Sequence, residues 1–232
     1  ATGAGALFLI DEMHNLDSQS LAAICIAFQA VSRNALPVAL VGAGLPDLQL
    51  RLMSAKPYAD RLFHYLELGR LTDAAARAAL IQPAATRNVE FQEKAARQVV
   101  RESAGCPYFL QEYGLELWNH AESSPITSAD VQAVHEIVTD SLARNFFATR
   151  FQLATDAEQR YLAAMASLGA APYGSTDIAH AYGAKDQRGV SIHRDALIQK
   201  GLIWAPRRGK LDFTVPLFAE YLRENHPLAS FA

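Results

Sequence analysis

The chain has 232 residues, of which 50% are hydrophobic and 19% are charged, and its formal net charge at pH 7 is −3. This composition excludes a disordered polyelectrolyte and a chain that binds polyanions along its whole length. The mean hydropathy of +0.02 and the lack of a long apolar segment predict no membrane-spanning helix and no membrane partner. Two isolated cysteines predict reduced thiols in a cytoplasmic protein, and neither they nor the histidines follow a metal-binding motif.

The first part of the chain has the pattern of a parallel α/β sheet. Residues 6–11 and 37–41 are short continuous apolar runs typical of buried strands, and residues 62–68 are a weaker candidate for a third strand. Asp17 can cap a helix between the first two runs, and another helix begins near Pro46. Alternating strands and helices predict parallel pairing, so we expect about half of a sheet that helices cover on both faces.

From residue 72 onward the pattern becomes helical. Capping signals at Thr72, Thr127 and Thr155 precede apolar residues at helical spacing, and Pro107 starts a further helix. After residue 155, three helices precede two short strands that flank the basic sequence RRGK at 207–210. Such an order is typical of a winged helix-turn-helix. The expected fold class is therefore mostly α-helical with a partial parallel sheet.

The first strand ends in two carboxylates, Asp11 and Glu12. In parallel sheets the carboxyl ends of the strands border the ligand crevice. One carboxylate there can hold Mg²⁺, and a second can orient a water molecule for attack on a phosphate. The alternative is an acidic turn without a ligand, because a hydrophobic run followed by Asp-Glu is common.

Taken together, five segments in a fixed order resemble AAA+ P-loop ATPases of the ORC/Cdc6-like and STAND-related group. They are LFLIDE at 7–12, VGAGLP at 41–46, YADRLFHYLELGRL at 58–71, GCPYFLQ at 105–111 and the C-terminal helices with their basic hairpin. This resemblance covers nearly the whole chain. It implies the C-terminal half of a nucleotide-binding core at 1–70, a helical lid at 71–152 and a winged helix-turn-helix at 153–232. It also implies ATP and Mg²⁺ as cofactors of the full-length protein, which would act as a nucleotide-dependent switch.

The same resemblance assigns roles by position. Asp11 corresponds to the residue that binds Mg²⁺ and the nucleotide, and Glu12 to the catalytic glutamate. Arg61 corresponds to an arginine finger, although an ion pair on a solvated surface is an equal alternative. Pro107 and Tyr108 lie where the lid of the family closes over the nucleotide, and packing of the lid helix is their alternative.

Three departures from the family pattern limit what the chain can do alone. The sequence contains no GxxxxGK[ST] loop, Ala43 and Gly44 replace the polar residue expected after the second strand, and no arginine follows Gly105. We therefore expect the chain to be the C-terminal part of a longer protein and to bind ATP weakly or not at all. The parent protein is expected to hydrolyse ATP if a phosphate-binding loop precedes this sequence.

Residues 185–210 contain seven basic and two acidic side chains. A recognition helix enters the major groove and a basic wing contacts phosphates, so this stretch predicts contact with double-stranded DNA. The candidate residues are Ser191, His193, Arg194, Lys200, Arg207, Arg208 and Lys210. Two alternatives stay open: a DNA-binding transcriptional regulator with a degenerate ATPase core, and a scaffold whose winged helix docks a partner protein.

Overall fold

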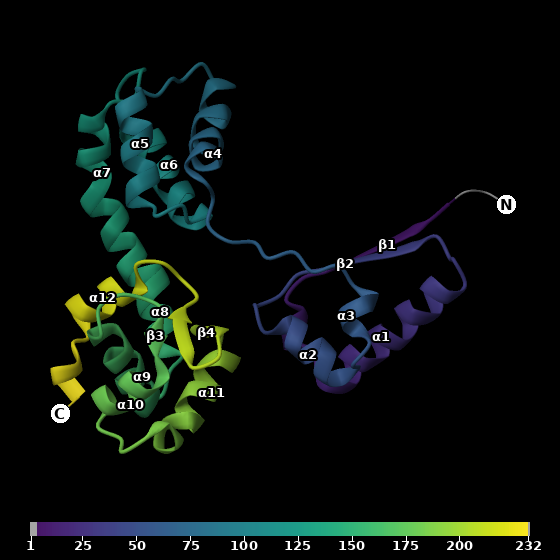
Figure 1. The fold of residues 1–232 in the computed structure, drawn as a ribbon. Helices are drawn as coiled ribbons and strands as arrows, with labels where there is room; N and C mark the ends of the chain where they lie inside the picture. Colours follow the sequence, from purple (N-terminus) through teal and green to yellow (C-terminus); the bar gives the residue numbers. More distant parts are fainter. Residues whose placement is uncertain (1–3, 232) are drawn as a thin grey trace. The chain divides into compact units, whose positions relative to one another are not determined.

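The computed structural model of the chain describes residues 4–231, and the chain divides into two compact units, residues 1–68 and 69–232 (Figure 1). No helix of the described residues is long and apolar enough to cross a membrane. The two units are taken in turn, each with its own hydrophobic core.

The first unit is built on a pair of parallel strands. Strand β1 (Ala6–Ile10) pairs with β2 (Val38–Gly42), with Ala6 opposite Val38 and Ile10 opposite Gly42. Helix α1 (Ser18–Arg33) connects them, and the Asp17 side chain caps it by accepting a hydrogen bond from the Ser20 backbone N–H at 2.7 Å. The predicted strand–helix–strand order is confirmed.

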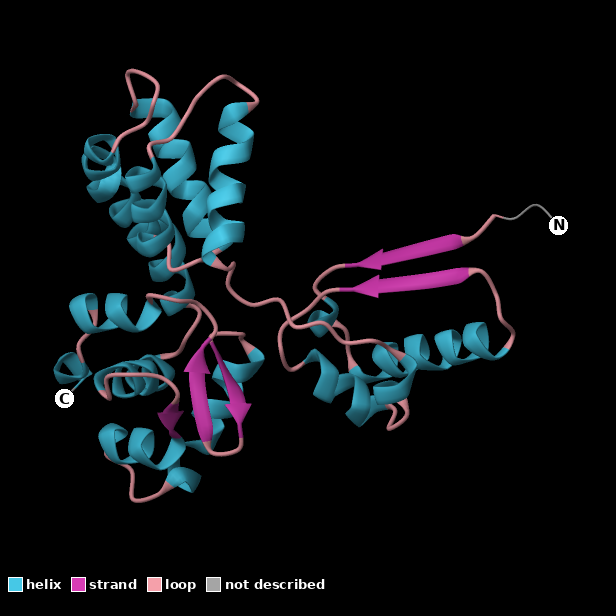
Figure 2. Ribbon diagram, turned by 45° about the horizontal axis from the view of Figure 1, so that its top comes forward, coloured by secondary structure: helices cyan, strands magenta, loops and turns pink. Residues whose placement is uncertain are grey.

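Three helices cover one face of this sheet. Helices α1, α2 (Leu48–Ala55) and α3 (Ala59–Leu62) lie on the same side of β1 and β2 (Figures 1 and 2). Their small core centres on five buried residues: Met13, Leu21, Cys25, Leu52 and Ala59. Met13 belongs to the short 3-10 helix η1 (Met13–Asn15), which follows β1 directly.

Two expectations about this sheet are wrong. The strands were predicted to be buried, but Leu7 and Leu9 of β1 are 62% and 72% exposed, because none of the unit's described helices covers the face on which they lie. The third strand, residues 62–68, does not form. Leu62 ends α3, and the next residues lie against the helices, with the Tyr65 hydroxyl donating to the Ala59 carbonyl at 3.1 Å.

The second unit begins with four helices. They are α4 (Asp73–Ala85), α5 (Glu93–Glu102), α6 (Pro107–His120) and α7 (Ser128–Ser141). The apolar stripes predicted from the sequence, including Val99, Leu117 and Val131, form their common core. The caps at Thr72 and Thr127 are confirmed, the latter as a capping box with Asp130. Helix α7 continues through a π-helical segment, η2 (Leu142–Phe147), into α8 (Ala148–Gln152).

The C-terminal part of the second unit combines three helices with a small antiparallel sheet. Helices α9 (Asp156–Ser167), α10 (Ser175–Tyr182) and α11 (Ser191–Gln199) precede the hairpin of β4 (Ile203–Arg207) and β5 (Lys210–Phe213). A two-residue strand, β3 (Tyr173–Gly174), pairs with β5, so that the strand order is β3-β5-β4 (Figure 2). The short η3 (Gln187–Val190) precedes α11, and α12 (Phe218–Asn225) and η4 (Leu228–Phe231) close the chain.

Candidate functional site

The acidic tip of β1 consists of Asp11 and Glu12, both exposed. The Asp11 carboxylate accepts the backbone N–H of Glu12 at 2.8 Å. Glu12 has a left-handed backbone with φ of 52° and ψ of 35°, a conformation that costs a non-glycine residue about 1 kcal/mol. The chain therefore turns sharply at Glu12, directly after the strand.

The end of β2 is attached to this turn by backbone hydrogen bonds. The Ala43 N–H donates to the Ile10 carbonyl at 2.9 Å, and the Met13 N–H donates to the Ala43 carbonyl at 2.8 Å. Gly42 has no room for a side chain, because a Cβ there would overlap the buried thioether of Met13. The small residues that follow β2 thus allow the two strand ends to lie together.

His14 and Arg51 hold the segment after Glu12. The Leu45 backbone N–H donates to His14 Nδ1 at 3.3 Å, so the ring proton sits on Nε2, which lies 3.2 Å from Glu12 Oε2. The Arg51 guanidinium of α2 donates to the carbonyl of His14 and, at 2.8 Å, to that of Leu16. No sequence signal identified His14 or Arg51, because both contacts depend on the tertiary fold.

The acidic tip supplies ligands of the kind that Mg²⁺ prefers. Among residues 4–231, no group of three or more His, Cys, Asp or Glu side chains could hold a metal ion by protein ligands alone. Mg²⁺ commonly retains several waters and takes one or two carboxylates together with phosphate oxygens. Asp11 and Glu12 fit that type of site, in which the nucleotide would provide the other ligands.

Arg61, the candidate arginine finger, also belongs to the first unit. Its side chain is 83% exposed, and its Nε lies 3.7 Å from the Asp60 carboxylate, a long contact on the surface. Such a contact contributes little, so the guanidinium remains available to another molecule. Its role stays a prediction.

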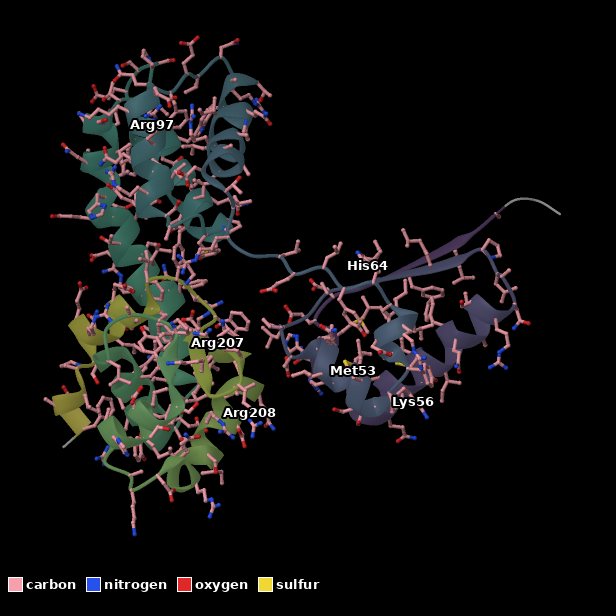
Figure 3. All side chains as sticks on the ribbon, in the orientation of Figure 1. Met53, Lys56, His64, Arg97, Arg207 and Arg208 are labelled. Carbon is pink, nitrogen blue, oxygen red and sulfur yellow. The ribbon has the colours of Figure 1, made fainter. Side chains whose placement is uncertain are left out.

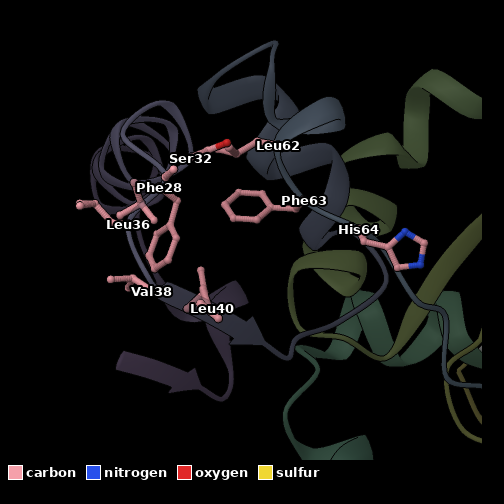
Figure 4. A pocket seen from close by; sticks show the side chains of 11 residues that line it. Phe28, Ser32, Leu36, Val38, Leu40, Leu62, Phe63 and His64 are labelled. Atoms are coloured by element: carbon pink, nitrogen blue, oxygen red, sulfur yellow. The ribbon is translucent and has the colours of Figure 1, made fainter. Parts of the chain in front are cut away.

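A shallow groove lined mainly by residues with apolar side chains runs beside β2 in the same unit. It has a volume of about 350 Å³ and is lined by α1, β2 and the segment that follows α3, with Phe28, Leu40 and Phe63 among its walls (Figure 4). It contains no carboxylate, and its only charged or titratable lining residue is His64. The groove therefore has no chemistry in common with the acidic tip.

Pro107 and Tyr108 lie in the second unit, in the first turn of α6. This helix follows Gly105, whose φ of 69° and close approach to the Leu71 carbonyl exclude a side chain. The Tyr108 ring stacks on Phe146 with centroids 4.7 Å apart, and the Arg150 guanidinium lies 3.6 Å from the same Phe146 ring. Tyr108 thus packs onto η2, as the alternative interpretation of this residue expects.

The predicted nucleic-acid contacts fall into two groups. Arg207, Arg208 and Lys210 surround the turn between β4 and β5, where Gly209 has a φ of 74° (Figure 3). Arg207 and Arg208 are exposed and Lys210 is half-buried, and none of the three forms an ion pair with a described residue. These three cations are therefore available to a polyanion.

The group on α11 and at its C-cap is largely engaged within the domain. The Ser191 hydroxyl donates to the Arg188 carbonyl at 3.1 Å, and the His193 ring lies 5.7 Å from the Tyr182 ring. Arg194 pairs with Asp195 at 2.8 Å. The Lys200 ammonium lies 2.6 Å from Glu158 and donates to the Leu153 carbonyl at 2.8 Å, so the geometry disfavours its predicted contact with DNA.

Comparisons with known proteins give a fold and one uncharacterised family. Residues 144–222 match a family described as a domain of unknown function (DUF8462), which covers less than half of the chain. No curated protein matches the chain.

Two of the most similar solved structures are ATPases. The RuvB Holliday junction branch migration motor of Thermotoga maritima is 18% identical with a TM-score of 0.52, over 94% of this chain and 69% of that chain. A Walker-type ATPase of Pyrococcus abyssi is 13% identical with a TM-score of 0.61, over 94% of this chain and 63% of that chain.

These neighbours agree with an AAA+-like fold at a coarse level. They do not indicate the ORC/Cdc6-like or STAND-related group, which stays a prediction. The described part of the chain, mostly helical with a small parallel sheet, matches a partial AAA+ core. At 13% and 18% identity the likeness concerns the fold alone: the chain shares the fold of these two proteins over 94% of its length.

Proposed function

We propose that this chain is the C-terminal part of an ATP-driven switch of the AAA+ class, in which a helical lid (71–152) couples nucleotide state to a winged-helix domain (153–232) that binds double-stranded DNA. The observation that carries this proposal is the acidic tip of β1. Two carboxylates follow a strand whose end is attached to that of its parallel neighbour, in a chain with an AAA+ fold.

The roles of the residues at the tip follow from their geometry. Asp11 would hold Mg²⁺, and Glu12 would orient the attacking water, while Mg²⁺-bound ATP supplies the phosphoryl group and neutralises the charge that develops on it. His14 is a positioning residue, because its Nε2 lies beside Glu12 Oε2 and its Nδ1 is fixed by the backbone of Leu45. The phosphate cradle would come from a loop outside this sequence, which has no GxxxxGK[ST].

The aromatic side chains of η2 support coupling between the lid and the C-terminal domain. The Phe147 ring lies 5.6 Å from Phe109 of α6 and 5.8 Å from Phe218 of α12. Since packed aromatic rings resist independent movement, a shift of the lid helix would be passed to the C-terminal helix through Phe147. π-Helical segments within longer helices are frequent at functional positions.

The order of elements after residue 155 supports a winged helix-turn-helix. Three helices, a short strand between the first two of them, and a basic hairpin that packs beside α11 are the parts of that motif. In this proposal α11 is the recognition helix and the hairpin at residues 203–213 is the wing. Exposed Arg207 and Arg208 would contact phosphates.

A salt-dependent titration with fluorescent duplex DNA tests the proposed DNA binding. The double variant Arg207→Ala/Arg208→Ala should bind more weakly at every salt concentration. The plot of log K against log[salt] should become shallower, with the magnitude of its negative slope smaller by about two. The matched control is Arg97→Ala/Arg101→Ala, which removes two exposed cations from α5. Equal affinities for the two double variants would contradict the proposed wing.

A second function, docking of a partner protein, is favoured by one observation. Leu115 and Trp118 of α6 are about half exposed and lie on the same side of that helix, because they are three residues apart. Exposed aromatic and aliphatic residues are enriched at protein interfaces. Absence of any DNA affinity at low salt would favour this function over the first.

A further inference from the structure

The outward face of α11 differs from the one that the sequence suggested. Leu197 is fully buried, His193 lies near Tyr182, and Arg194 pairs with Asp195. Ile192 and Gln199 are exposed, as is Asp195. Ile192 is 73% exposed, the most exposed of the large hydrophobic residues described in the second unit.

No other large apolar side chain adjoins this isoleucine at helical spacing. Its exposed or half-exposed neighbours at helical spacing are one cation, one acid and two small residues: Arg188, Asp195, Gly189 and Ala196. A protein-docking patch would need several adjoining apolar residues. Ile192 and its neighbours therefore do not form a protein-docking patch.

Two contacts hold two basic segments, the loop before α11 and the tip of the hairpin, against the first turn of α10. The Gln187 side chain donates to the Thr176 hydroxyl, and the Ser175 backbone N–H donates to the Gly209 carbonyl at 3.0 Å. Because Ser175 and Thr176 begin α10, the loop before α11 and the tip of the hairpin both lie against the same helical turn. The cations on these two segments are Lys185, Arg188, Arg207, Arg208 and Lys210. Among the described residues, none of the five is in an ion pair.

Asp195 indicates which part of a DNA duplex can face α11. A carboxylate repels phosphates, but it can accept a hydrogen bond from the amino group of cytosine, and glutamine can pair with adenine. An exposed aliphatic side chain on the same face has one apolar target in the major groove, the 5-methyl group of thymine. The outward face of α11 thus fits base edges, while the flanking cations fit the two phosphate backbones.

We infer that Ile192 is a specificity-determining residue that packs against the methyl group of a thymine in the major groove. This inference rests on the proposed DNA binding and goes beyond it, because it requires binding to depend on base sequence. Removal of one buried methyl group costs about 0.8 kcal/mol, so loss of this contact should weaken binding about fourfold.

The test begins with selection of duplexes from a random 20-base-pair library by the full 232-residue chain. Each thymine of the selected duplex is then replaced in turn by uracil, which lacks the methyl group. We expect one thymine whose replacement weakens binding by the wild-type chain about fourfold and leaves Ile192→Ala unaffected. The control variant is Ile137→Ala, an exposed isoleucine of α7, which should discriminate thymine from uracil as the wild type does.

The possible outcomes separate the inference from the function on which it rests. If Ile192→Ala still distinguishes thymine from uracil, or if the chain binds all duplexes equally, the inference is wrong and the DNA-binding proposal stands. If the wild-type chain binds no duplex at low salt, both are wrong. Circular dichroism of the variants checks that both exposed positions tolerate alanine.

Discussion

The ion pair between Lys200 and Glu158 shows how a single residue can change its interpretation once the fold is known. The ammonium lies 2.6 Å from a carboxylate whose side chain is only 8% exposed, and the same carboxylate completes the capping box of α9. A buried carboxylate that loses its partner pays a desolvation penalty. Lys200, which the sequence predicted to contact DNA, is thus engaged within the domain, and we expect it to stabilise the domain.

Replacement of Lys200 by methionine should lower the free energy of unfolding of the second unit by about 1–2 kcal/mol, because Glu158 would keep its burial without its cation. Urea denaturation measures this change. The control is Lys185→Met, at an exposed lysine outside any ion pair of the described residues, which should leave stability within about 0.5 kcal/mol. Equal stability of the two variants would show that the ion pair contributes nothing.

The same carboxylate predicts a pH dependence. Burial raises the pKa of Glu158, but the hydrogen bonds from Lys200 and Thr155 outweigh it and hold the pKa below the ordinary value of 4.5. The associated stability is therefore present above pH 4.5 and is lost as the pH falls through the lower pKa of the folded state. Denaturation midpoints below pH 4.5 should fall more steeply for the wild type than for Glu158→Gln, and parallel curves would contradict the assignment.

Local signals predict residue roles only where the partners are close in sequence. The capping boxes at Thr127 and Thr155 could be predicted, because both partners lie within one helical turn. The contact between His14 and Leu45 and that between Lys200 and Glu158 join residues far apart in the chain. The geometry of these two contacts depends on how whole elements pack, so rules based on residue spacing do not predict it.

At the scale of elements, the π-helical segment η2 is the feature that periodicity concealed. Helical spacing continues from Val138 through Leu142 to Phe146, and this spacing alone is that of an uninterrupted helix. The adjacent pair Phe146 and Phe147 was the sequence signal for the irregular turn. Two neighbouring residues of a regular α-helix point about 100° apart, so both cannot face the centre of the same core. Both are buried here, because the wider turn brings them to the same core.

Phe147 joins the lid helices to α12, so its removal should be costly. Phe147→Ala should lower the free energy of unfolding of the second unit by about 3–4 kcal/mol through a cavity between Phe109, Phe218 and Tyr221. Chemical denaturation measures the loss. Leu153→Ala, at a residue that is mostly exposed just after α8, should change stability by less than about 0.5 kcal/mol. A similarly small change for Phe147→Ala would exclude the packing role.

The strands show the opposite limit of sequence reasoning. The apolar runs predicted β1 and β2 correctly, but they also predicted burial, and Leu7 and Leu9 are exposed. A hydrophobic strand is suited to burial, but its sequence does not show whether other elements of the described chain cover both of its faces. Residues 62–68 gave a false strand: Phe63 and Tyr65 pack onto the helices, whereas Leu66 and Leu68 are 77% and 93% exposed.

At the scale of the whole molecule, the order of elements was the most predictable property. Strand and helix patterns in the first unit and helices in the second follow from periodicity and capping. The proposed boundary between lid and winged helix at residue 152 stays a prediction, because one continuous core runs from the four-helix part into the C-terminal domain. Coupling of movement between the helical lid and the C-terminal domain would require such a shared core.

The proposed switch requires the acidic tip to act on a metal-bound nucleotide. The most direct measurement is Mg²⁺-dependent ATP hydrolysis by the protein that contains this chain together with a phosphate-binding loop. Asp11→Asn should reduce turnover by about a hundredfold or more, because the metal loses a charged ligand. Asp140→Asn, at an exposed aspartate of α7, should leave it unchanged. Equal turnover in Asp11→Asn and the wild type would contradict the assignment of this site.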